Sequence, residues 1–92
     1  MKKKELVAQI AREAGISVEA ASAALKATEG AIRRALQAGE RVTLTGFGSF
    51  YVSQRAERQT RNPQTGQPML LKAARVAHFR PGKVLKTALN AN

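Results

Sequence analysis

The chain has 92 residues, no cysteine and a net charge of +10 at pH 7. Without cysteine it forms neither disulfides nor thiolate metal sites, and no acid–base or nucleophilic set of side chains is visible. No apolar run approaches the roughly 18 residues of a membrane-spanning helix, and the lysine-rich start does not lead into a signal-peptide core. We therefore expect a cytoplasmic protein that is not an enzyme and needs no cofactor or metal.

The positive charge is concentrated in the second half of the chain. Residues 1–46 hold eight Lys or Arg and five Glu, a net charge of +3, whereas residues 47–92 hold eight Lys or Arg and one Glu, a net charge of +7. A basic chain of this kind can meet nucleic acid, an anionic membrane or an acidic protein. The choice among these three partners therefore depends on which predicted elements carry the lysines and arginines.

The first half predicts two helices. One begins after the N-terminal lysines and ends at Gly15, which can adopt the left-handed conformation of a helix end. Ser17 is a suitable N-cap for the second, which Gly39 ends. Its apolar stripe comprises Ala21, Ala24, Leu25, Thr28, Ile32, Ala35 and Leu36. Gly30 interrupts this helix at a cost of roughly 0.5–1 kcal/mol relative to alanine, unless a neighbouring backbone packs against it.

After Gly39 the period of the pattern changes to two. Val42 and Leu44 alternate with threonines, and Phe50 and Val52 resume the alternation on a second strand. A return strand carries Met69, Leu70, Leu71, Val76 and Phe79, and Lys83 to Leu89 forms a short closing helix. We predict one α+β domain over residues 1–92: two N-terminal helices, a three-stranded antiparallel sheet with a long β-hairpin arm at about residues 53–76, and a short C-terminal helix. So small a core favours an oligomer.

The arm is basic and has no core of its own. Between Val52 and Met69 it carries no large apolar side chain, and its arginines recur every third residue from Arg55 against a single Glu57. A two-stranded ribbon is marginally stable in water but narrow enough to enter a DNA groove. At its turn, Pro63 either sets the backbone or acts as a wedge between base steps. The arm predicts nucleic-acid binding.

Three spaced motifs resemble one family over essentially the whole chain. They are Gly46-Phe47-Gly48-Ser49-Phe50, Arg61-Asn62-Pro63-Gln64-Thr65-Gly66 and Phe79-x-x-Gly82-Lys83-x-Leu85-Lys86. The chain thus resembles the bacterial histone-like HU and integration host factor family. The resemblance implies an intertwined dimer whose two β-arms wrap the minor groove of bent DNA, which Pro63 kinks by intercalation. It further implies a nucleoid-associated protein that condenses DNA.

The resemblance also assigns residues. The implied DNA-binding set is Lys3, Arg55, Arg58, Arg61, Asn62, Pro63, Gln64, Lys72, Arg75, Arg80, Lys83 and Lys86, and the implied dimer core is Phe47, Phe50 and Phe79. Three aromatic rings could instead stack on bases, although phenylalanines between aliphatic strands are more often core. The chain departs from the family at Thr60, Gln67 and Pro68. It is closer to HU overall, with residues around Arg75 and Arg80 that are closer to integration host factor.

The leading function is that of an architectural protein that binds bent, nicked or distorted double-stranded DNA with little sequence specificity. It would act as a homodimer, or as a heterodimer with a paralogue. One alternative is a subunit of a sequence-specific, integration-host-factor-like heterodimer, and another is an RNA-binding basic protein. Tyr51 receives no role. The lone His78 beside a core phenylalanine is interpreted as structural, with a neutral contact to DNA as the alternative.

Overall fold

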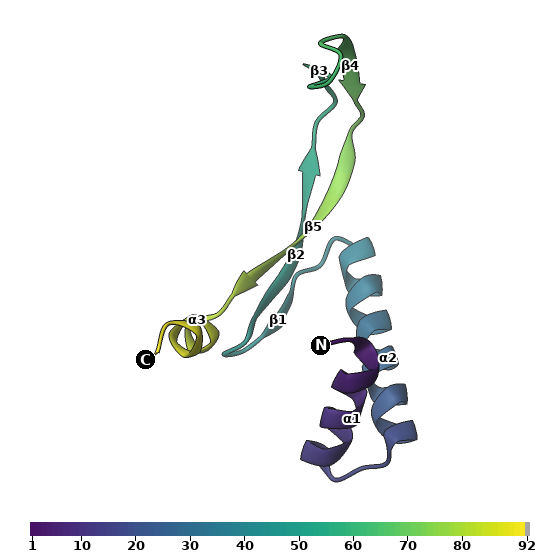
Figure 1. Ribbon diagram of the computed structural model, residues 1–92, viewed down its shortest axis with the longest axis vertical. Helices are drawn as coiled ribbons and strands as arrows, with labels where there is room; N and C mark the ends of the chain where they lie inside the picture. Colours follow the sequence, from purple (N-terminus) through teal and green to yellow (C-terminus); the bar gives the residue numbers. More distant parts are fainter. Residues whose placement is uncertain (92) are drawn as a thin grey trace. The chain divides into compact units, whose positions relative to one another are not determined.

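The computed structural model describes residues 1–91 and divides the chain into two compact units, Met1–Arg34 and Ala35–Asn92. Figure 1 shows the elements, in which two helices come first, antiparallel strands follow and a short helix closes the described chain, as the sequence predicts. They are α1 (Lys3–Ala14), α2 (Val18–Gln37), β1 (Val42–Leu44), β2 (Gly48–Arg55), β3 (Arg58–Arg61), β4 (Pro68–Leu71), β5 (Ala74–Pro81) and α3 (Lys83–Asn90). The α+β class is confirmed.

The predicted signals set the ends of α1 and α2. Gly15 adopts the left-handed conformation with φ of 67°, and its N–H donates to the carbonyl of Ala11. The Ser17 hydroxyl accepts the N–H of Ala20 at 3.0 Å, which satisfies one of the free donors of the first turn of α2. Beyond the end of α2, the N–H of Gly39 donates to the Leu36 carbonyl at 3.0 Å.

The first unit has a very small core. Val7, Ala11 and Ala21 are buried, and Ile10 and Leu25 pack against them. Because so few apolar side chains are covered, packing within this unit contributes little stability by burial alone.

Gly30 is buried on α2, although no neighbouring helix explains it. The Arg34 side chain lies over it, so that a Cβ added at position 30 would stand 3.1 Å from a guanidinium nitrogen. The glycine leaves room for the side chain of an arginine one turn further along the same helix, and the three atoms nearest to the added Cβ all belong to that side chain rather than to a neighbouring backbone.

The sheet of the second unit has the order β1-β2-β5 and is antiparallel throughout. Phe50 stands opposite Val42 on one side and Phe79 on the other, so that the apolar side chains of the strands share one face. Gly48 is required beneath this cluster, because a Cβ there would lie 2.5 Å from the Phe79 ring and 2.7 Å from the Arg80 carbonyl oxygen. We call the opposite face, formed by Thr43, Ser49, Tyr51, Ser53, Val76, His78 and Arg80, the polar face.

The arm differs from one continuous hairpin. The β2–β5 ladder ends at the pair Arg55 and Ala74, and a separate ladder of β3 and β4 begins at the pair Arg58 and Leu71. Residues 56–57 and 72–73 lie unpaired between them. The predicted return strand is therefore two strands, and the arm consists of the end of the sheet followed by a two-stranded tip (Figure 1).

Candidate nucleic-acid interface

The turn at the arm tip is held by its own polar groups. The Asn62 side-chain oxygen accepts the N–H of Gln64 at 2.9 Å, and the Asn62 carbonyl accepts the N–H of Gly66 at 2.7 Å. Gly66 has a positive φ of 73°, which glycine adopts without strain. Pro63 is exposed and takes no part in these hydrogen bonds. The turn is therefore closed by its neighbours, and the proline ring stays free for a partner.

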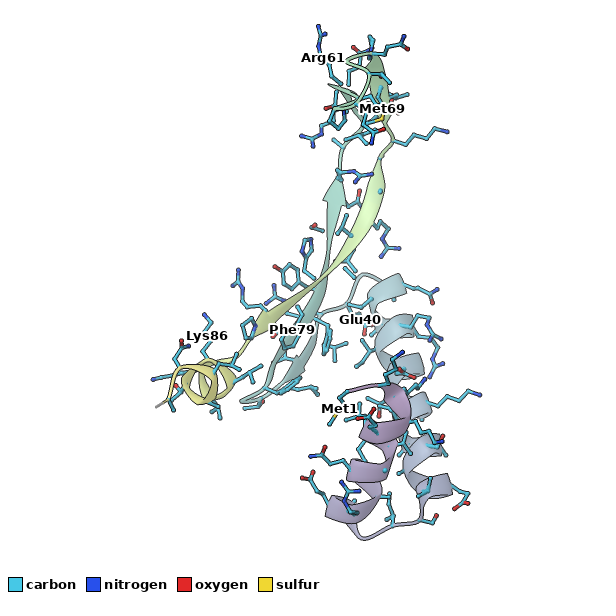
Figure 2. All side chains as sticks on the ribbon, in the orientation of Figure 1. Met1, Glu40, Arg61, Met69, Phe79 and Lys86 are labelled. Atoms are coloured by element: carbon cyan, nitrogen blue, oxygen red, sulfur yellow. The ribbon has the colours of Figure 1, made fainter. Side chains whose placement is uncertain are left out.

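The arginines and the lysine of the arm reach solvent. Figure 2 shows Arg61 and Met69 at the far end of the arm, and Arg61 donates to the Gly66 carbonyl at 3.3 Å. Arg55 donates to the Lys72 carbonyl at 3.2 Å, across the gap between the two ladders. Within residues 1–91, neither Arg58 nor Lys72 uses its side-chain cation in a hydrogen bond or ion pair. Most of the arm's charge is therefore unneutralised by the protein.

Arg75 differs from the other cations that the resemblance assigned to the arm. Its guanidinium donates to the Leu36 carbonyl at 2.8 Å. The last carbonyls of a helix lack intrahelical donors, so that this contact caps the C-terminal end of α2. No local sequence pattern predicts this contact, because the two residues are 39 positions apart. Arg75 already has a structural partner in the protein.

The remaining cations of the implied set stand on three other elements. Lys83 and Lys86 are exposed on α3, where Figure 2 labels Lys86, and Arg80 is exposed on β5. Lys3 on α1 forms an ion pair with Glu29 at 2.8 Å. Exposed ion pairs of this kind contribute at most about 1 kcal/mol of stability, so that Lys3 can readily leave Glu29 for another anion.

The three phenylalanines form one cluster that a single chain leaves partly uncovered. The ring of Phe79 lies 5.5 Å from that of Phe47 and 4.9 Å from that of Phe50, centroid to centroid. Phe47 is nevertheless 49% exposed and Phe79 41% exposed, and on α3 Leu89 is 72% exposed. The rings pack against one another at tilted angles of 51°, and the dimer core remains a prediction from the family resemblance.

The polar face holds a group of contacts that the sequence did not reveal. The rings of Tyr51 and His78 stack with centroids 5.2 Å apart, and His78 Nε2 lies 2.7 Å from the Ser53 hydroxyl oxygen. The Arg41 guanidinium carbon lies 4.9 Å from the centroid of the Tyr51 ring. Strand alternation could have indicated part of this group, because it places Tyr51 on the face of the sheet opposite to Phe50.

Similarity to known proteins identifies the class to which this chain belongs. A family model described as "Bacterial DNA-binding protein" matches residues 1–90. The chain therefore belongs to this family of bacterial DNA-binding proteins.

Similar proteins bear the name HU. The DNA-binding protein HU-beta of Neisseria meningitidis is 56% identical over 89 residues, which cover 97% of this chain and 100% of that protein. The solved structure of Anabaena HU with DNA matches with a TM-score of 0.91 and 38% identity, over 100% of both chains. That of Thermotoga maritima HU matches with a TM-score of 0.71 and 31% identity, over 98% of this chain and 100% of that chain. These relatives favour HU over an integration-host-factor-like subunit.

Two features are absent from the part of the chain that the structure describes. Among residues 1–91, no helix is both long and apolar enough to cross a membrane. In the same part of the chain, no three His, Cys, Asp or Glu side chains gather as a metal site would require.

Proposed function

We propose that this protein is an HU-type architectural DNA-binding protein that bends duplex DNA with little sequence specificity. The observation that carries the proposal is the arm, where exposed cations without protein partners lead to a turn that holds Pro63 outward. Family membership and the similarity to an HU–DNA structure support the same function. Such a protein catalyses no reaction and is associated with the nucleoid.

A dimer is part of the proposal. The phenylalanine cluster and the outer side of α3 leave large apolar side chains exposed on one chain, including Val84 at 66% and Leu89 at 72%. Large exposed apolar side chains that gather in a patch mark a protein–protein interface. A second copy that covers Phe47 and Phe79 would supply the core that each chain lacks.

Binding follows from counterion release. Each phosphate neutralised by a lysine or arginine releases condensed cations, so that log K falls with log[salt] by about 0.9 per contact. If about eight cations of the dimer meet phosphates, the slope is near −7. We propose that Arg55, Arg58, Arg61 and Lys72 of the arm and Arg80, Lys83 and Lys86 of the body supply most of these contacts. Lys3 joins them after leaving Glu29, and Asn62 and Gln64 flank the wedge at the tip.

Pro63 supplies the bend. A proline inserted between base steps partly unstacks them and kinks the duplex. DNA that is already nicked or distorted requires less deformation energy, so that it is bound more tightly than linear duplex. Sequence preference then arises from deformability rather than from base contacts.

The decisive experiment is DNA binding by the purified chain alone. Linear, nicked and four-way DNA and A-form RNA are compared at two salt concentrations, with light scattering to give the mass of the free protein. We expect a dimer that binds nicked and four-way DNA before linear DNA, and DNA before RNA. A folded stable monomer, or a salt slope shallower than about −2, would contradict the proposal. Tight binding of RNA, or binding only after a paralogue is added, would favour one of the alternatives.

A further inference from the structure

Helix α2 carries a basic groove that the proposed DNA interface does not use. The groove is lined by Ala23, Lys26, Ala27, Gly30, Arg33 and Arg34, and we call it the α2 groove. All of these residues belong to the unit Met1–Arg34. The cations proposed to hold phosphates belong to the other unit, apart from Lys3. The α2 groove is therefore a second charged surface of the chain.

The floor of the α2 groove is made of small side chains. Ala23, Ala27 and Gly30 recur at helical spacing, so that they share one face of α2 over two turns. The distance between packed helices depends on the size of the side chains at the contact, and this floor lets a second helix approach closely. An apolar floor is also stabilised when apolar groups cover it.

Three cations stand around this floor without a partner in the protein. Lys26, Arg33 and Arg34 are exposed, and within residues 1–91 none of their side chains takes part in a hydrogen bond or ion pair. Glu29, the carboxylate that lies between them in the sequence, already pairs with Lys3 at 2.8 Å. The charge of the α2 groove is therefore left for an anionic partner.

Gly30 draws one of these cations onto the floor. The guanidinium of Arg34 lies over this glycine, so close that a Cβ added at position 30 would stand 3.1 Å from one of its nitrogens. Gly30 lies between Lys26 and Arg33 in the helix, and those two residues are about 10 Å apart along its axis. The α2 groove thus presents a cation at its middle and one toward each end.

We propose that the α2 groove docks an acidic amphipathic helix of another protein. Small apolar side chains of that helix pack on Ala23 and Ala27, and its carboxylates meet Lys26, Arg33 and Arg34. Carboxylates seven residues apart on a helix share a face and match the spacing of Lys26 and Arg33. Complementary charges of this kind steer the encounter and fix the register of the two partners. This surface is separate from the proposed DNA interface and extends the protein's function to a protein partner.

Two other occupants match the α2 groove less well. A second copy of this chain carries a net charge of +10 and is repelled, and each carboxylate of α1 directly follows a cation, in Lys4-Glu5 and in Arg12-Glu13. A DNA duplex offers phosphates to the cations but no apolar group to the floor. An acidic helix satisfies both features of the groove at once.

The test uses a synthetic peptide of about 20 residues, long enough to form a helix. The patterned peptide carries glutamates seven residues apart on one face, with alanines between them. The control peptide has the same composition, with its glutamates spread around the helix. Each is titrated into the isotope-labelled full chain in about 0.15 M salt, which screens distant charges, and followed by NMR. We expect the patterned peptide to bind about tenfold more tightly and to shift the amide signals of residues 23–34.

Two variants separate charge from shape. Arg33→Gln with Arg34→Gln removes two cations and is expected to weaken binding of the patterned peptide by about tenfold. Ala27→Gln leaves the charge of the chain unchanged but fills the floor, and is expected to weaken binding to a similar degree. Arg58→Gln with Arg61→Gln removes the same charge from the arm and should leave this affinity unchanged. Urea unfolding establishes that each variant is folded.

Equal affinity for the two peptides would overturn the inference, and so would wild-type affinity in Ala27→Gln. A shallower salt slope of duplex binding in Arg33→Gln with Arg34→Gln would assign the α2 groove to DNA instead. Assemblies larger than a dimer that this variant abolishes would assign it to a second copy. Because the peptide is titrated without DNA, failure of the proposed function leaves these results unaffected.

Discussion

The two ladders of the second unit share an antiparallel backbone and differ in what covers them. In the β2–β5 ladder one face packs the rings of Phe50 and Phe79 together. In the β3–β4 ladder every residue except Thr60 and Leu71 is exposed, and the face of Leu70 has no partner layer. A ribbon without a covered face is marginally stable. The sheet is therefore built for packing, whereas the tip is built to receive DNA.

The largest effect is expected in the sheet. Phe79→Ala removes the ring that contacts both Phe47 and Phe50, and where the proposed second copy covers this ring, its truncation costs about 3–5 kcal/mol. Urea unfolding followed by circular dichroism measures this loss, and light scattering reports the dimer. The matched variant Leu70→Ala lies on the exposed tip. An equal loss in both variants would mean that the two ladders are not distinguished by packing.

Charge at the tip is expected to act on binding alone. Arg58→Gln with Arg61→Gln removes four cations from the dimer, so that the salt slope becomes shallower by about 3 to 4. Both side chains are exposed, and surface substitutions of this kind usually stay within about 0.5 kcal/mol of stability. Fluorescence anisotropy across a salt series gives the slope. A marked fall in the unfolding midpoint would show that the tip arginines also hold the fold.

The wedge separates bending from affinity. Pro63→Ala keeps the hydrogen bonds by which Asn62 closes the turn but removes the rigid ring. Because partial unstacking of a base step involves a few kcal/mol, the bend angle is expected to fall more than the affinity. Energy transfer between dyes at the two duplex ends measures the angle. Equal bending by wild type and variant would leave Pro63 as a turn former.

The smallest effect is expected for Arg75, the arm cation that already donates a hydrogen bond to a helix end. Arg75→Gln weakens the cap on the Leu36 carbonyl, and an exposed hydrogen bond of this kind contributes about 1 kcal/mol. The unfolding midpoint should fall slightly while the salt slope stays unchanged. The comparison variant is Lys72→Gln, which should leave the unfolding midpoint unchanged and make the salt slope shallower. A shallower slope for Arg75→Gln would return this residue to the set of phosphate contacts.

Local signals were sufficient for much of the fold. Gly15, Ser17 and Gly39 predicted the helix ends correctly because caps act within one turn of chain. Asn62 and Gly66 predicted the tip turn for the same reason. The phenylalanine cluster followed from strand alternation together with the family resemblance.

Contacts that depend on register could not be predicted in this way. The pairing of Tyr51 with His78 requires the exact alignment of β2 and β5, and the contact of Arg75 with Leu36 joins a strand to the end of a helix. The gap between the two ladders also lacks a local signal, because residues 56–57 include neither glycine nor proline. The family resemblance therefore assigned one role to all the arm cations, Arg75 included.

That gap has a consequence for how the arm meets curved DNA. Residues 56–57 and 72–73 are outside both ladders, so that their backbone torsions set the angle between tip and sheet. Because no ladder hydrogen bond must break for these torsions to change, the tip can follow grooves of different curvature while the sheet keeps its register. One rigid base can then serve duplexes that are straight, nicked or sharply bent.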